Sequence, residues 1–143
     1  MAVSKDGIVA KSEDDKMDWT GHLDKKVFRL LTMVGGKPLG AGRKTFGLLP
    51  ELGGRSVVSI SRTEGQGCSL GSFDRMTDGE GWLIGGQTLA LSAIDEGFVQ
   101  EMFLCRSSNA AFEGVKADLR LLNFGRLCGE IRFSDHLTVE VRR

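Results

Sequence analysis

The chain has 143 residues, and its 19 Lys and Arg residues balance its 19 Asp and Glu residues. A chain of this length is expected to form one domain over residues 1–143, with enough apolar content to bury a core. The balanced charge argues against a surface for nucleic acid or an anionic membrane, and no run approaches the roughly 18–20 apolar residues of a membrane span.

The pattern along the chain predicts strands that alternate with helices and then a terminal hairpin. The expected strands cover 1–4, 39–42, 55–61, 82–84, 101–107, 119–122, 130–133 and 137–141, and the expected helices cover 22–34, 43–49 and 88–94. The segment 70–76 fits more than one structure. The last two strands would form a hairpin across the polar turn 134–136. This order predicts an α/β fold with a mostly parallel central sheet, flanking helices and a C-terminal antiparallel hairpin.

The clearest helical pattern lies in residues 22–34. Four apolar residues fall on one stripe at helical spacing, which predicts a buried face: Leu23, Val27, Leu30 and Val34. Gly35-Gly36 is expected to end this helix. Asp24 lies on the flank of the stripe, so its carboxylate is expected at the edge of the core.

Cysteine and histidine do not form a metal-binding pattern in the sequence. Cys68, Cys105 and Cys128 are widely spaced, and the only histidines are His22 and His136. We therefore expect reduced thiols, a cytoplasmic location and no metal site.

Three polar or Gly-rich segments directly follow predicted strands. They read Gly-Arg-Lys-Thr-Phe at 42–46, Ser-Arg at 61–62 and Gly-Gly-Gln-Thr at 85–88. A strand that leads into a helix start favours anions through its amide N–H groups and the helix dipole, and glycine lets the backbone approach a pyrophosphate closely. Each segment alone is usually an ordinary turn or solvated surface. Their order along the chain predicts a site that binds a dinucleotide across the ends of several strands.

These segments and a few further residues resemble the dihydrofolate reductase family in residue type and order. The further residues are Trp19 with Asp24 five positions later, Phe28, Gly54-Arg55 and the strand end Ile84-Gly85-Gly86. The resemblance covers about residues 1–115 and identifies a divergent, compact member.

The resemblance implies NADPH-dependent hydride transfer to dihydrofolate. Asp24 would bind the pterin and promote protonation of its N5, and Trp19 would order a water and brace the loop over the site. Phe28 would pack on the pterin and aminobenzoyl rings. Arg55 would pair with the α-carboxylate of the substrate's glutamate.

Further roles follow from the same resemblance. Ala2, Leu49 and Ile84 would contact substrate. Cofactor-binding roles fall on Ala10, Gly42, Arg43, Lys44, Thr45, Ser61, Arg62, Gly85, Gly86, Gln87 and Thr88. The arginines in this set would help to hold the 2′-phosphate that distinguishes NADPH from NADH. The hydroxyl that supports the family's acidic residue aligns near Cys105 or Arg106, and both stay open. We expect a monomer that binds dihydrofolate, and neither nucleic acid nor membrane.

Two other interpretations remain. One is a reductase of the pyrimidine-reductase type in riboflavin synthesis, against which Asp24, Phe28 and Arg55 argue. The other is a reductase-like binding protein that keeps the nucleotide cleft and turns over poorly. Asp24 also suits a helix N-terminus without any catalytic role, and Arg55 also suits an exposed surface.

Overall fold

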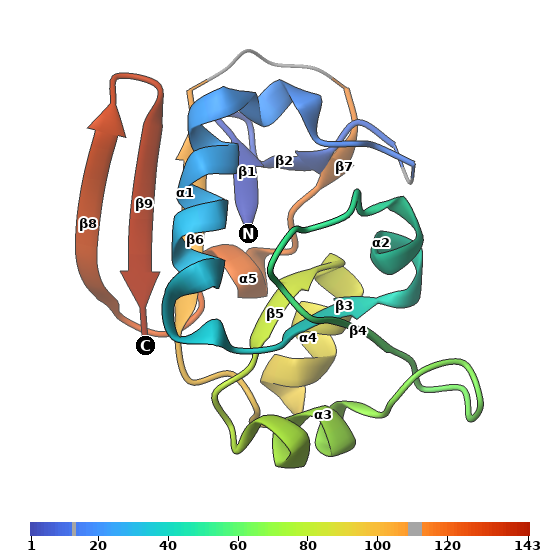
Figure 1. Cartoon of the computed structure of the whole chain (residues 1–143). Helices are drawn as coiled ribbons and strands as arrows, with labels where there is room; N and C mark the ends of the chain where they lie inside the picture. The colour runs from blue at the N-terminus through green and yellow to red at the C-terminus, as the bar shows by residue number, and fades with distance from the viewer. Residues whose placement is uncertain (13, 109–112) are drawn as a thin grey trace. The chain divides into compact units, whose positions relative to one another are not determined.

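The computed structural model describes residues 1–12, 14–108 and 113–143, which form two compact units of mixed α/β structure (Figure 1). Unit 1 contains residues 1–27 and 100–143, and unit 2 contains residues 28–99. Within the described residues, none of the helices has the length and apolarity needed to cross a bilayer. The single domain over residues 1–143 stays a prediction.

Unit 1 is built on a mixed four-stranded sheet. Its strands are β1 (Ala2–Ser4), β6 (Met102–Ser107), β9 (Leu137–Arg142) and β8 (Leu127–Ser134), in that spatial order. β1 and β6 are parallel, whereas β9 is antiparallel to both of its neighbours. Val3 and Leu104 are buried on one face of this sheet, and Val139, which pairs with Cys105, is buried on the other face. The predicted C-terminal hairpin is confirmed.

A second, two-stranded sheet of unit 1 pairs β2 (Ile8–Ala10) with β7 (Val115–Lys116) in antiparallel fashion. No strand was expected at β7, which is only two residues long. Before helix α1 lies a short 3-10 helix, η1 (Asp18–Thr20), and α1 itself (Gly21–Met33) contains the boundary between the units.

The strand predicted at 119–122 is wrong, because these residues form the one-turn helix α5 (Leu119–Leu122). The Asp118 side chain caps the turn by accepting the backbone N–H of Arg120 at 2.8 Å. Leu121 is fully buried while Leu119 is exposed. A short apolar run of this kind fits a strand and a buried helical turn equally well.

Unit 2 contains a parallel three-stranded sheet in the order β4-β3-β5. These strands are β3 (Leu39–Gly42), β4 (Val57–Ile60) and β5 (Trp82–Gly85). Parallel strands were predicted as one central sheet. The structure instead places them in this sheet and in the β1–β6 pair of unit 1, so the prediction is confirmed only at the level of a mixed α/β fold.

Three α-helices follow the strands of unit 2: α2 (Arg43–Leu48), α3 (Leu70–Thr77) and α4 (Gln87–Asp95). A short 3-10 helix, η2 (Val34–Gly36), follows α1. The segment 70–76, which the sequence left open, is helical. It begins at Ser69, whose hydroxyl accepts the N–H of Ser72 at 3.1 Å. Ile60, Phe73 and Ala93 join the sheet to its helices in one buried cluster.

The predicted apolar stripe of α1 is wrong. Val27 is 3% exposed, but Leu30 is 60% and Val34 is 66% exposed, and Leu23 is exposed as well. The buried side of the helix instead includes Thr32 and the half-buried Asp24, Phe28 and Leu31. Both sets repeat once per helical turn, so periodicity did not distinguish the inner face from the outer one.

Candidate functional site

The carboxyl ends of the three parallel strands in unit 2 bring the predicted phosphate-binding segments to one edge of the sheet. Gly42 pairs with Ile60, and Ala41 pairs with Gly85. β3 therefore ends beside the ends of both neighbours. We call the residues at these ends the strand-end edge; it consists of residues 42–45, 61–62 and 85–88.

The glycines of this edge are required by the close approach of Thr45. A side chain at Gly85 would place its Cβ 2.7 Å from Thr45 Cγ2, and one at Gly86 would lie 3.4 Å from Thr45 Oγ1. Gly86 also has φ +74°, a conformation that favours glycine. The Thr45 side chain of α2 is thus packed directly against the glycine turn before α4.

The start of α4 presents backbone N–H groups at the same edge. The first helical hydrogen bond runs from Ala90 N to Gly86 O at 3.1 Å, so the N–H groups of Gln87 and Thr88 precede the helix ladder. Gly86 occupies the cap position and has no side chain to cover them. This geometry suits an anionic ligand.

The cationic and hydroxyl groups of the strand-end edge come from α2 and from the loop after β4. Arg43 and Lys44 are exposed in the first turn of α2, and Arg43 donates a hydrogen bond to the side chain of Gln66. Ser61 Oγ accepts the N–H of Thr63 at 3.0 Å. Arg62 is exposed directly after Ser61. Positive charge therefore flanks the glycine turn on two segments.

Arg55 lies against Thr32 and Phe28 within unit 2. Its Nη1 donates to Thr32 Oγ1 at 2.9 Å, and its guanidinium carbon lies 5.5 Å from the centroid of the Phe28 ring. Its Nε is buried and has no hydrogen-bond partner among the described residues. Burial lowers the pKa of Arg55 below its usual value, and the nearby charge of Arg29 lowers it further. A carboxylate paired with this guanidinium would offset the desolvation.

In unit 1, the half-buried Asp24 of α1 lies beside the buried thiol of Cys105 on β6. Burial raises the pKa of Cys105 to about 11, and the charge and hydrogen bond of Asp24 act in the same direction, against the N-terminal ammonium group. Of the two residues that the sequence left open, Cys105 lies beside Asp24, while Arg106 pairs with Glu140. Ala2 pairs with Cys105 in the adjacent strand β1.

Trp19 is held by a residue that the sequence analysis missed. Its indole N–H donates to Asp15 at 2.9 Å. The Asp15 carboxylate also accepts the backbone N–H groups of Lys11, at 2.6 Å, and Met17, at 2.8 Å. An Asp that bonds the backbone two residues later is a common loop device and was the available signal.

The other predicted residues occupy ordinary backbone positions. Ala10 lies at the end of β2, and a side chain on Gly114 would collide with its carbonyl oxygen. Leu49 follows α2 and donates its N–H to Thr45 O at 3.1 Å. Ile84 is half-buried in β5. The structure thus gathers the predicted phosphate ligands in unit 2, and it places Ala2, Ala10, Trp19 and Asp24 in unit 1.

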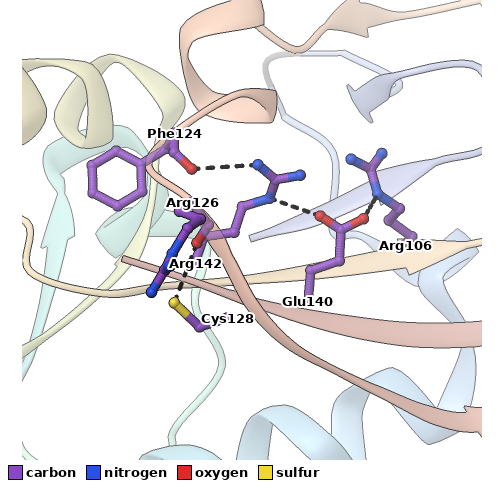
Figure 2. A network of polar contacts seen from close by, with 6 residues as sticks. All are labelled: Arg106, Phe124, Arg126, Cys128, Glu140 and Arg142. Atoms are coloured by element: carbon purple, nitrogen blue, oxygen red, sulfur yellow. Dashed lines mark hydrogen bonds and ion pairs between the residues drawn. The ribbon is translucent and has the colours of Figure 1, made fainter.

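A further charged network lies on unit 1 and includes no predicted site residue (Figure 2). The buried carboxylate of Glu140 accepts hydrogen bonds from Arg106 and, at 2.7 Å, from Arg142. Burial alone would raise the pKa of Glu140, but the two guanidinium groups overcome it and hold the pKa below its usual value. Arg142 also donates to Phe124 O at 3.4 Å. Arg106 therefore forms an ion pair with Glu140.

A scan against protein-family models finds no match for this chain. A search of curated proteins likewise finds no significant match. Any assignment of function therefore depends on the residues and contacts described above.

Proposed function

We propose that the protein reduces 7,8-dihydrofolate to tetrahydrofolate by hydride transfer from NADPH. The observation that carries this proposal is the surroundings of Arg55. Its guanidinium Nε is buried and lacks a partner among the described residues, and the ring of Phe28 lies next to the guanidinium. A ligand that combines an aromatic ring with a carboxylate would stack on Phe28 and pair with Arg55. The aminobenzoyl-glutamate part of dihydrofolate has both features.

The strand-end edge supports the choice of cofactor. NADPH contains a pyrophosphate and a 2′-phosphate, and this edge combines a glycine turn, helix N–H groups and three cationic side chains. Gly85 and Gly86 would let the pyrophosphate approach the backbone. Arg43, Lys44 and Arg62 would neutralise the phosphates, and a guanidinium would bind the 2′-phosphate through two donors. When bound, NADPH would supply the hydride.

Within unit 1, the chain's own contribution to the chemistry would come from Asp24. Its carboxylate would accept hydrogen bonds from the pterin N3 and exocyclic amine, and it would promote protonation at N5. The thiol of Cys105 would orient the carboxylate, because at neutral pH it remains a hydrogen-bond donor. Trp19, held by Asp15, would brace the loop.

The test is the loss of NADPH absorbance when dihydrofolate is added to the purified protein. We expect turnover that requires both compounds and that falls sharply in Asp24→Asn. The matched control is Asp18→Asn, because Asp18 is an exposed acid six residues earlier that pairs with the exposed Lys25. NADPH binding without any dihydrofolate-dependent oxidation would reject the reductase and favour a nucleotide-binding protein.

A further inference from the structure

Strand β8 forms an open edge of the unit 1 sheet (Figure 1). Among the described residues, β9 is its only neighbour in the sheet. Seven of its eight residues are exposed, including Leu127 at 46%, Ile131 at 53% and Phe133 at 39%. An edge strand presents backbone N–H and C=O groups that can pair with another strand. β8 contains neither Lys nor Pro, the residues that most often block such pairing.

The regular part of this edge is short and well defined. Residues 129–132 pair with 138–141 of β9 in an unbroken register. The register shifts on both sides of this stretch, between 127 and 129 and between 132 and 134. Bulges bend a strand and limit pairing with a new neighbour. A second strand would therefore have to centre on residues 129–132.

We propose that β8 pairs with β8 of a second copy of this chain, antiparallel, about a two-fold axis at Ile131. In such a symmetric pair, opposite residues share a face of the sheet, so the axis must pass through one residue of the strand. With Ile131 on the axis, Glu130 of each copy lies opposite Arg132 of the other. Opposite charges across strands are stabilising.

Neighbouring registers lose this complementarity. An axis at Glu130 would place two glutamates opposite each other, and an axis at Arg132 would place two arginines opposite each other. Like charges directly opposite are destabilising. The regular part of β8 is thus self-complementary in one register, which identifies a second copy, rather than an unrelated strand, as the occupant of the edge.

The same register makes use of the exposed apolar residues. Ile131 of one copy would lie opposite Ile131 of the other. A Cβ on Gly129 would meet nothing within 4 Å, so the space above this glycine is open to a side chain from the facing strand. Arg132 pairs with Asp135 at 2.8 Å in the single chain, but both side chains are exposed and such pairs contribute little.

The dimer should be reversible, because a pair of short strands buries less than the roughly 1,600 Å² of a standard interface. Sedimentation equilibrium should show a rise from the chain mass of 15.5 kDa toward twice that value as concentration increases. Arg132→Glu and Glu130→Arg should each weaken the dimer by about tenfold or more, since each places like charges together. The double variant Glu130→Arg/Arg132→Glu should restore it.

Asp135→Asn is the matched control for loss of the Arg132–Asp135 pair, and it should leave the dimer at least as tight. A wild-type chain that stays monomeric up to about 0.5 mM would overturn the proposal. So would a dimer that both single charge reversals leave unchanged, because it would form through another face. Circular dichroism establishes that each variant is folded.

Crosslinking tests the register without a charge reversal. In a Cys128→Ser background, Ile131→Cys should form a disulfide between copies, since facing Cβ atoms in an antiparallel pair approach to about 4.5 Å, the upper end of the disulfide range. A mixture of Glu130→Cys and Arg132→Cys chains in that background should also crosslink, while each alone should not. Dominant Cys128–Cys128 crosslinking in the wild type, or no crosslink from Ile131→Cys, would overturn the proposed register.

Discussion

The thiol of Cys105 on β6 lies close enough to the carboxylate of Asp24 on α1 for that carboxylate to raise the pKa of the thiol. Burial, together with that carboxylate, raises the pKa of Cys105 to about 11 from its ordinary value of 9.0. The folded state therefore keeps the thiol protonated over a pH range in which the unfolded chain would release the proton.

Stability should fall as pH rises from about 9 to about 11. In that range the folded protein keeps the Cys105 proton more often than the unfolded chain does. The contribution of the buried thiol to the free energy of unfolding is therefore complete below pH 9 and is lost between pH 9 and pH 11. A rise of about two pKa units corresponds to roughly 2–3 kcal/mol of the free energy of unfolding. Urea unfolding at both pH values should show a smaller fall in Cys105→Ala than in the wild type. Equal falls would mean that the thiol does not titrate as a buried group.

Asp24→Asn should leave NADPH affinity intact and lower hydride transfer near neutral pH by about 10²–10⁴-fold, the usual contribution of a positioned acid or base. Cys105→Thr should retain much of the activity that Cys105→Ala loses, because threonine keeps a donor beside the carboxylate. Single-turnover kinetics would measure both effects. Full activity in Asp24→Asn would remove this residue from the mechanism.

Arg62→Ala and Arg43→Ala should weaken NADPH binding far more than NADH binding, because only NADPH has the 2′-phosphate. Dissociation constants for both cofactors can be measured by fluorescence quenching. Arg75→Ala, an exposed arginine on α3, is the control and should change neither. If both cofactors lose affinity equally, these arginines do not bind the 2′-phosphate.

Gly85→Ala should lower both stability and NADPH affinity. The new methyl group would lie 2.7 Å from Thr45 Cγ2, and overpacking of this kind typically costs about 1–3 kcal/mol. Thr45→Ser removes the methyl group that collides and should recover part of the stability in the double variant. Thermal unfolding of the single and double variants measures this coupling. Additive losses would show that the two positions are not in contact.

The strand-end edge could be predicted from the sequence because its signals are local. Residues 39–42 form a strand with the predicted bounds, and Gly85-Gly86 ends β5 where a glycine break was expected. Parallel pairing then places the ends of neighbouring strands together. The composition of this edge was therefore set by residues adjacent along the chain.

The supports of the site could not be predicted in the same way. The contact of Cys105 with Asp24 joins residues 81 positions apart, and Asp15 holds Trp19 through a loop geometry that periodicity does not describe. The inner face of α1 was also misidentified, because the stripe containing Leu30 and the stripe containing Phe28 have the same period. Tertiary packing decides among such local alternatives.

The most direct test of the folate assignment is Arg55→Leu assayed with dihydrofolate and with a dihydropterin that lacks the glutamyl tail. Loss of a hydrogen bond between charged groups costs about 1.5–3 kcal/mol, or roughly one to two decades of affinity. We predict that KM for dihydrofolate rises by that amount, while KM for the tail-less substrate and the affinity for NADPH hardly change. Equal losses for the two substrates would show that Arg55 only supports the fold through Thr32 and Phe28, and would contradict a folate substrate.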